Sequence, residues 1–171
     1  KIPQLLLADD YEAAKQYAIT LRDMIDEGDF YIELQDHGIE EQKRINPKLV
    51  QLAKEIGVKV VATNDAHYIE RSDAEMHEVL LCIQTGKTLD DPSRMRFETD
   101  QFYIKTPEEM EKLFAWVPEA ITSTAEIANK CNVKITRQDL MPPFRPEDGS
   151  TPPEYLRKLA YEGLEKRYGV I

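Results

Sequence analysis

A strand–helix–strand pattern between residues 30 and 62 constrains the fold of this chain most strongly. Residues 30–34 read FYIEL, with apolar side chains at alternate positions, which predicts a half-buried strand. Apolar residues at helical spacing follow, with Asn46 expected as the N-cap and Pro47 in the first turn. Only Gly57 separates this predicted helix from a second apolar strand over residues 58–62. Such close joining predicts two parallel strands connected by a right-handed crossover.

The polar residues that follow the two strands form the first candidate site. Neighbouring parallel strands end at the same edge of a sheet, and barrels and open α/β sheets place their active sites at that edge. The first strand is followed by QDHG, which contains His37, and the second by NDAH, which contains Asp65 and His67. We therefore expect both histidines at one edge of the sheet.

Asp65 and His67 are candidate metal ligands. If the chain leaves the strand extended, residues two apart share a face, so both side chains can face one point. A carboxylate oxygen and an imidazole nitrogen suit Zn²⁺, Mn²⁺ or Fe. The spacing also arises by chance, and an Asp that satisfies turn N–H groups beside a partly exposed His is the alternative. For His37, the alternative is an ordinary polar turn closed by Gly38.

Composition limits the remaining classes. The chain has 171 residues and a formal net charge of −10, from 32 acidic and 22 basic residues. Phosphate contacts need Lys and Arg, so we do not expect this chain alone to bind DNA strongly. No apolar run is long enough to predict a membrane span. Cys82 and Cys131 lie in helix-like patterns and are expected to be buried free thiols, which favours a reducing, cytoplasmic location.

The rest of the chain is expected to be mainly helical. Residues 8–25 predict a helix with Asp9 as its cap. A capping box at Ser72 predicts a second helix, whose inward stripe is Met76, Val79, Leu80 and Ile83.

Between and after these helices, three further features are expected. Residues 102–104 predict a short strand, and Thr106 and Pro118 open further helices. Arg94 and Arg96 could grip phosphate or a neighbouring domain, although a solvated loop is the ordinary interpretation.

A domain boundary is expected between Asn132 and Thr151. The stretch MPPFRPEDG is rich in proline and predicts an extended connector, and Thr151 then begins a last amphipathic helix. We assign residues 1–135 to one domain and residues 136–171 to a connector with the first helix of another. The chain has no initiator Met, so a piece of a longer chain is expected.

Four stretches carry a family resemblance: FYIELQDHGIEEQKRIN, VVATNDAHY, HEVLLCIQTGKTLDDPSRMRFETDQFYIKTPEEM and PEAITSTAEIANKCNV. Together they closely resemble the alpha subunits of bacterial DNA polymerase III, the replicative C-family polymerases. The resemblance covers essentially the whole chain. It matches the later part of the N-terminal PHP (polymerase and histidinol phosphatase) domain and the start of the polymerase region.

The resemblance implies a fold and a ligand set. It implies an α/β fold that is helix-rich, a partial PHP-type distorted (β/α)7 barrel with a helical extension towards the polymerase palm. The late Asp-x-His metal motif of that domain is matched by Asp65 and His67, with His37 as a second-rank candidate. The other ligands are expected before Lys1 and the polymerase carboxylates after Ile171, so none of those carboxylates is expected in this chain.

The resemblance also implies a function. The parent would be a DNA-directed DNA polymerase (a nucleotidyltransferase) that uses Mg²⁺ in DNA replication, with DNA and other replisome subunits as partners. Its PHP site would hold divalent metal ions and perform 3′–5′ exonuclease or other phosphoesterase chemistry. Two ligands hold a divalent ion poorly, so the fragment alone is expected to be inactive.

Two other functions are weighed against this one. The alternative is a non-catalytic scaffold that stabilises the polymerase and binds a proofreading or other replisome subunit. A free-standing PHP phosphoesterase is disfavoured by the connector and helix that follow Met141.

Overall fold

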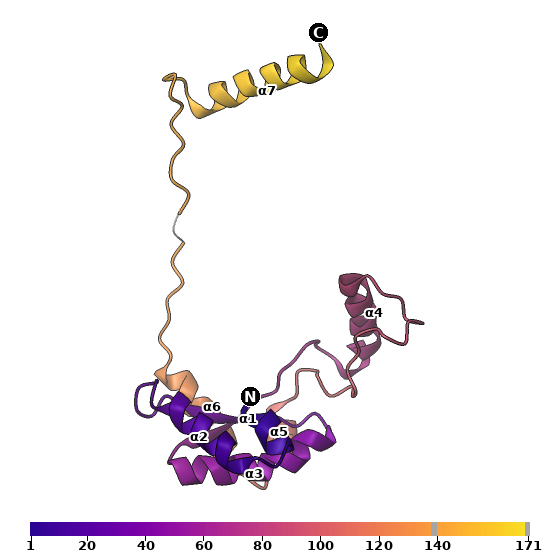
Figure 1. Cartoon of the computed structure of the whole chain (residues 1–171), viewed down its shortest axis with the longest axis vertical. Coiled ribbons are helices and arrows are strands. Elements are labelled where there is room, and N and C mark those ends of the chain that lie inside the picture. The colour runs from indigo at the N-terminus through magenta and orange to yellow at the C-terminus, as the bar shows by residue number, and fades with distance from the viewer. Residues whose placement is uncertain (138–139, 170–171) are drawn as a thin grey trace. The chain divides into compact units, whose positions relative to one another are not determined.

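The computed structural model describes residues 1–137 and 140–169. The chain divides into two units, the first over Lys1–Asn132 and the second from Val133 onward. Figure 1 labels the helices α1 to α7 and colours the chain from its N-terminus to its C-terminus. The elements are α1 (Ile2–Leu7), α2 (Tyr11–Arg22), β1 (Tyr31–Leu34), α3 (Glu40–Ile56), β2 (Lys59–Ala62), the 3-10 helix η1 (Arg71–Asp73), α4 (Ala74–Thr85), α5 (Pro107–Leu113), α6 (Pro118–Lys130) and α7 (Pro152–Tyr168).

A small parallel sheet organises the first unit. β1 pairs with β2 in parallel, with Tyr31 opposite Lys59 at one end and Leu34 opposite Ala62 at the other. The amide of Thr63 donates to the Leu34 carbonyl at 3.1 Å and extends the ladder past β2. The predicted α/β class and the parallel pair are therefore confirmed.

The core of the first unit lies around α3 and the two strands. α3 contacts both strands as well as α1 and α2, while α6 packs on β2. Alternating side chains of each strand are buried because one face of the sheet meets these helices. The buried apolar set is Leu6, Ala14, Ala18, Ile32, Leu34, Ile45, Leu49, Leu52, Ala53, Ile56, Val60, Ala62, Phe114, Val117 and Ala120.

The start of α3 differs from the sequence-based expectation. The helix begins at Glu40, after an extended Ile39, so Asn46 and Pro47 lie inside it. Asn46 is buried and its Nδ2 donates to the Gln35 carbonyl at 3.0 Å, which ties the helix to the end of β1. Pro47 lacks the N–H that would pair with the carbonyl of Lys43. Both residues are exposed, so water can reach that carbonyl and the helix continues.

The first helical region also differs. The expected helix over residues 8–25 is two helices, α1 and α2, with a break between them. Asp9 has φ 58° and forms an ion pair with Lys48 at 2.5 Å instead of capping a helix. The cap of α2 is Asp10, whose side chain accepts from the Ala13 amide at 3.2 Å.

The helix α4 buries fewer of its apolar side chains than its sequence predicts. It begins at Ala74 after η1, and the capping box pairs Glu70 with Asp73 in place of the expected Ser72. Cys82 is the one buried side chain within α4, all of whose residues are described. The expected inward stripe is instead exposed: Met76, Val79, Leu80 and Ile83.

The two free cysteines have different environments. Cys82 is buried, as expected of a core thiol, whereas Cys131 is exposed. The expectation for Cys131 is wrong because this residue follows the last turn of α6, where the chain leaves the packed unit.

The second unit contains α7. Its start at Pro152 agrees with the expected cap, because Thr151 and Glu154 form a capping box. The Thr151 hydroxyl donates to the Glu154 carboxylate at 2.7 Å. No helix in the described part of the chain combines the length and hydropathy needed to cross a lipid bilayer.

Candidate functional site

The candidate site lies where the chain leaves the carboxyl ends of β1 and β2. A third segment of the chain, residues 97–105, joins it there. Tyr68 and Tyr103 form an isolated parallel bridge, and the His67 amide donates to the Phe102 carbonyl at 2.7 Å. The short strand expected at residues 102–104 is therefore reduced to a single bridge position. It still brings a third segment of chain to the loop that follows β2.

The structure brings Asp65 and His67 together. Asp65 Oδ1 lies 3.4 Å from His67 Nε2, and the two side chains are 45% and 38% exposed. We expected an extended backbone to bring the two side chains together, but Asp65 has a left-handed conformation with φ 50°. Asp tolerates this left-handed region better than most residues. The convergence therefore comes from a turn at Asp65, and the pair stays accessible to solvent.

Aromatic rings surround the His67 imidazole. The ring of Phe97 stands edge-on to it with centroids 4.7 Å apart, and Phe102 and His77 each lie 5.7 Å away. Burial lowers the pKa of His77, and the proximity of His67 lowers it further. The packing limits how far the His67 ring can rotate.

His37 is buried next to this cluster. Its ring stacks on Phe102 with centroids 4.1 Å apart and planes 11° apart. Nε2 lies 2.8 Å from the Asn64 carbonyl oxygen, and Nδ1 lies 3.0 Å from Gln42 Nε2. Both ring nitrogens therefore have protein partners, a contact pattern that the sequence did not reveal.

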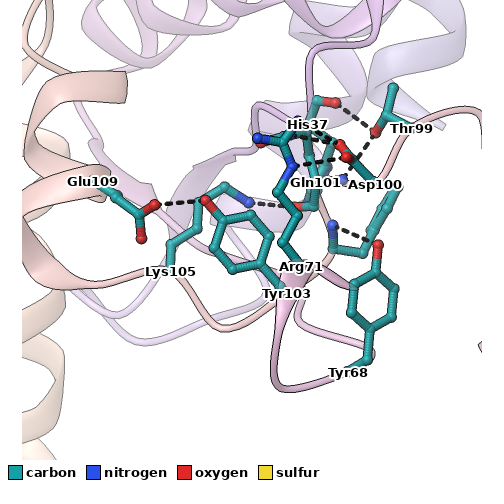
Figure 2. Close-up of polar contacts among 10 residues, drawn as sticks. His37, Tyr68, Arg71, Thr99, Asp100, Gln101, Tyr103, Lys105 and Glu109 are labelled. Carbon is teal, nitrogen blue, oxygen red and sulfur yellow. Dashed lines mark hydrogen bonds and ion pairs between the residues drawn. The ribbon is translucent and has the colours of Figure 1, made fainter. Parts of the chain in front are cut away.

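Polar contacts hold the third segment in place, as Figure 2 shows. Arg71 binds the carboxylate of Asp100 through Nε at 2.7 Å and Nη2 at 3.1 Å. This pairing lowers the pKa of Asp100 and raises that of Arg71. Thr99 Oγ1 donates to the His37 carbonyl at 2.7 Å, which ties the same segment to the loop after β1.

A second group of contacts lies on the α5 side of this segment (Figure 2). The Tyr103 hydroxyl donates to Glu109 at 2.6 Å, and this hydrogen bond raises the pKa of the phenol. The Lys105 ammonium donates to the Gln101 carbonyl and lies 3.4 Å from Asn64 Oδ1. Burial lowers the pKa of Lys105. These residues support the loop that carries Asp65.

Arg94 and Arg96 occupy different surroundings. Arg94 Nη2 lies 2.5 Å from Glu78 of α4, so this cation is paired within the chain. Arg96 is exposed. The expected solvated loop therefore describes Arg96, whereas the Arg94 side chain is only 16% exposed.

The capacity of the site to hold a metal ion is limited to two donors. Among the residues that the structure describes, no group of three or more His, Cys, Asp or Glu side chains could hold a metal ion. Asp65 and His67 supply one oxygen and one nitrogen, the donor types that Zn²⁺, Mn²⁺ and Fe accept. The pair can therefore contribute to a metal site but cannot form one by itself.

Fold and site together define an α/β segment whose histidines and carboxylates lie at the carboxyl ends of parallel strands. No family model matches the chain. It is 44% identical to the DNA polymerase III subunit alpha of Thermus aquaticus over 98% of its length, and 39% identical to that of Treponema pallidum over 100%. It is 41% identical to the same subunit of Deinococcus radiodurans over 98% of its length.

Along nearly its whole length, the chain thus corresponds to a segment of DNA polymerase III alpha subunits, and the resemblance predicted from the sequence is confirmed. The chain spans only 13% to 15% of the length of these three relatives.

Proposed function

We propose that this chain is part of the alpha subunit of a bacterial replicative DNA polymerase. In this proposal residues 1–135 are the later part of a PHP-type (β/α)7 barrel, and residues 136–171 connect it to the polymerase region. The parent would be a cytoplasmic, Mg²⁺-dependent DNA-directed DNA polymerase, with DNA and other replisome subunits as its partners. Similarity to DNA polymerase III alpha subunits over 98% to 100% of the chain supports this assignment.

Within that parent, Asp65 and His67 would provide two ligands of a divalent metal site. The single observation that carries this proposal is their 3.4 Å approach at the edge where parallel strands end. A bound Zn²⁺, Mn²⁺ or Fe ion would activate water and stabilise phosphate charge, as phosphoester hydrolysis or a 3′–5′ exonuclease requires. The Asp65 carboxylate and the His67 imidazole would hold it. Phe97 and Phe102 would keep the imidazole oriented.

The isolated chain would have little activity of this kind. Catalytic zinc sites use three protein ligands and a water molecule, and structural sites use four. The described residues offer two that converge. The remaining ligands would come from other parts of the parent.

A second candidate function has an observation in its favour. With two donors among the described residues and an imidazole packed against aromatic rings, the edge could serve as a scaffold without catalysis. The region would then stabilise the polymerase and bind a proofreading or other replisome subunit. The two candidates differ in whether the full-length protein carries metal.

Metal analysis of the full-length protein separates the candidates. We expect bound divalent metal in the purified protein. Asp65→Ala should reduce both metal content and 3′–5′ exonuclease activity, while primer extension with Mg²⁺ and deoxynucleotides continues. Asp26→Ala is the matched control, because Asp26 precedes β1 and lies at the opposite end of the strands from the candidate site.

Three outcomes are informative. Loss of metal in Asp65→Ala, but not in Asp26→Ala, supports the metal site. A metal-free protein that is unaffected by either substitution supports the scaffold. Absence of primer extension by the unmodified full-length protein would overturn the polymerase assignment itself.

A further inference from the structure

We propose that His37 is a positioning residue that fixes the loop carrying Asp65 and His67, and is not itself a metal ligand. The proposal rests on the proposed metal site for its functional consequence. Its structural part stands on contacts within the chain and can be tested separately. These contacts join the buried His37 residue to three other segments of the chain.

The hydrogen-bond partners of His37 assign its tautomer. The backbone N–H of His37 donates to Gln42 Oε1 at 2.8 Å. Because an N–H group can only donate, this contact identifies the oxygen atom of the Gln42 side-chain amide. The other end, Nε2, is a donor and lies 3.0 Å from His37 Nδ1. Nδ1 must therefore accept, and the ring carries its proton on Nε2. Nε2–H in turn donates to the Asn64 carbonyl at 2.8 Å.

The surroundings of His37 leave the ring little freedom. The residue is 1% exposed and its ring lies flat against Phe102. Its own carbonyl accepts from Thr99 Oγ1 at 2.7 Å. His37 thus links the loop after β1, the first turn of α3 through Gln42, the loop after β2 and the segment over residues 97–105. The sequence signal was only a histidine after a strand.

The bond to Asn64 acts on the residue that follows it. The carbonyl of Asn64 and the N–H of Asp65 belong to one planar peptide unit, so holding the oxygen fixes the plane from which Asp65 departs. Asn64 is also held by its side chain, whose Nδ2 donates to the Tyr103 carbonyl at 3.0 Å. Asp65 then turns through φ 50°, which directs its carboxylate to His67. Without the hydrogen bond from His37, Asn64 would keep only its hydrogen bond to the Tyr103 carbonyl, and the strained turn at Asp65 would be held less firmly.

Two substitutions isolate the proposed role. In His37→Gln, the side-chain amide reaches about as far as imidazole Nε2 and can still donate to the Asn64 carbonyl. In His37→Asn, the amide ends near the position of Nδ1 and cannot reach that carbonyl. Both variants lose the ring that stacks on Phe102, so they lose similar packing. The Asn side chain can still accept from Gln42 at the Nδ1 position, so a milder effect of His37→Gln than of His37→Asn reports the Asn64 bond.

The first measurement uses nuclear magnetic resonance on the 171-residue chain. We expect the ¹⁵N signals of the His37 ring to show an unprotonated Nδ1 and a protonated Nε2. These signals should not move when Zn²⁺ is added. The amide signals of Asp65 and His67 should shift more in His37→Asn than in His37→Gln, because both variants lose the ring but only His37→Asn loses the bond to Asn64. Movement of the His37 ring signals on addition of Zn²⁺ would make it a ligand and overturn the proposal.

The second measurement uses the full-length protein. Residues that support a metal ligand typically change metal affinity by about 10- to 100-fold. We expect a loss of about tenfold for His37→Asn, with most of the affinity restored in His37→Gln. Equal losses in both variants would overturn the positioning role. A full-length protein without metal would instead overturn the proposed metal site, and the ring and amide signals would still decide the role of His37.

Discussion

The helices α3 and α4 carry the same pattern of apolar residues but have opposite environments. In each helix four apolar residues occupy the positions i, i+3, i+4 and i+7, which define one face. The α3 set is Leu49, Leu52, Ala53 and Ile56, each 5% exposed or less, whereas Met76, Val79, Leu80 and Ile83 of α4 are 42% to 72% exposed. The pattern predicts a face in both helices, but the fold decides what covers it.

The difference follows from where each helix lies in the chain. α3 is the crossover between two parallel strands, so its apolar face must lie against them. α4 follows β2 through the candidate-site loop, and its main contact with another element is with η1. One helix therefore belongs to the core, while the other lies outside it.

The largest expected effect is a cavity under α3. Leu52 is 0% exposed, so Leu52→Ala should lower the free energy of unfolding by about 2–5 kcal/mol. Urea unfolding followed by the fluorescence of Trp116, the single tryptophan, would measure it. Trp116 lies between the buried Phe114 and Val117 and therefore reports on this unit. A loss below 1 kcal/mol would mean that α3 does not form the core in solution.

A smaller effect is expected at the glycine that ends α3. Gly57 has φ 74°, and an L residue in this left-handed region costs about 1–2 kcal/mol. Gly57→Ala should therefore destabilise the unit by about 1 kcal/mol in the same experiment. Gly86→Ala is the matched control, because Gly86 ends α4 with φ 64°. Equal shifts of the Trp116 transition in both variants would mean that α4 unfolds together with the core.

An alkaline pH dependence is expected beside α3. Burial and, to a smaller extent, the nearby Glu55 carboxylate of α3 together raise the pKa of Tyr11 to about 12. The unfolded chain loses the phenol proton near the ordinary value of 10, so stability is full below that pH and falls as pH rises towards 12. In Tyr11→Phe this fall should be shallower. Unfolding midpoints across that range would measure it, and an unchanged slope would contradict it.

The smallest effect is expected on the exposed face of α4. Ile83 is 72% exposed, and surface substitutions of this kind usually change stability by about 0.5 kcal/mol or less. Ile83→Ala should therefore leave the urea midpoint almost unchanged, whether Trp116 fluorescence or far-ultraviolet circular dichroism is followed. A loss comparable to that of Leu52→Ala would mean that another surface covers this face in solution.

Local patterns predicted much of the framework around the candidate site. Alternation over residues 30–34 and the single Gly57 link predicted the parallel strands, and that pairing placed the loops with His37 and Asp65 at one edge. These predictions succeed because they depend on chain geometry over a few residues. The prediction that Asn46 caps α3 was wrong. Its side chain bonds to the distant end of β1, and no local pattern encodes that contact.

The sequence by itself determined the parallel strand pair, the end of α3 at Gly57, the start of α7 after Thr151 and which residues follow the strands, since these depend on local backbone geometry and capping. Tertiary structure alone decided the left-handed turn at Asp65, the hydrogen bond between the buried His37 ring and the Asn64 carbonyl, and the exposure of the α4 face. Each of these depends on segments far apart in the chain, and their approach is set by packing of the whole unit.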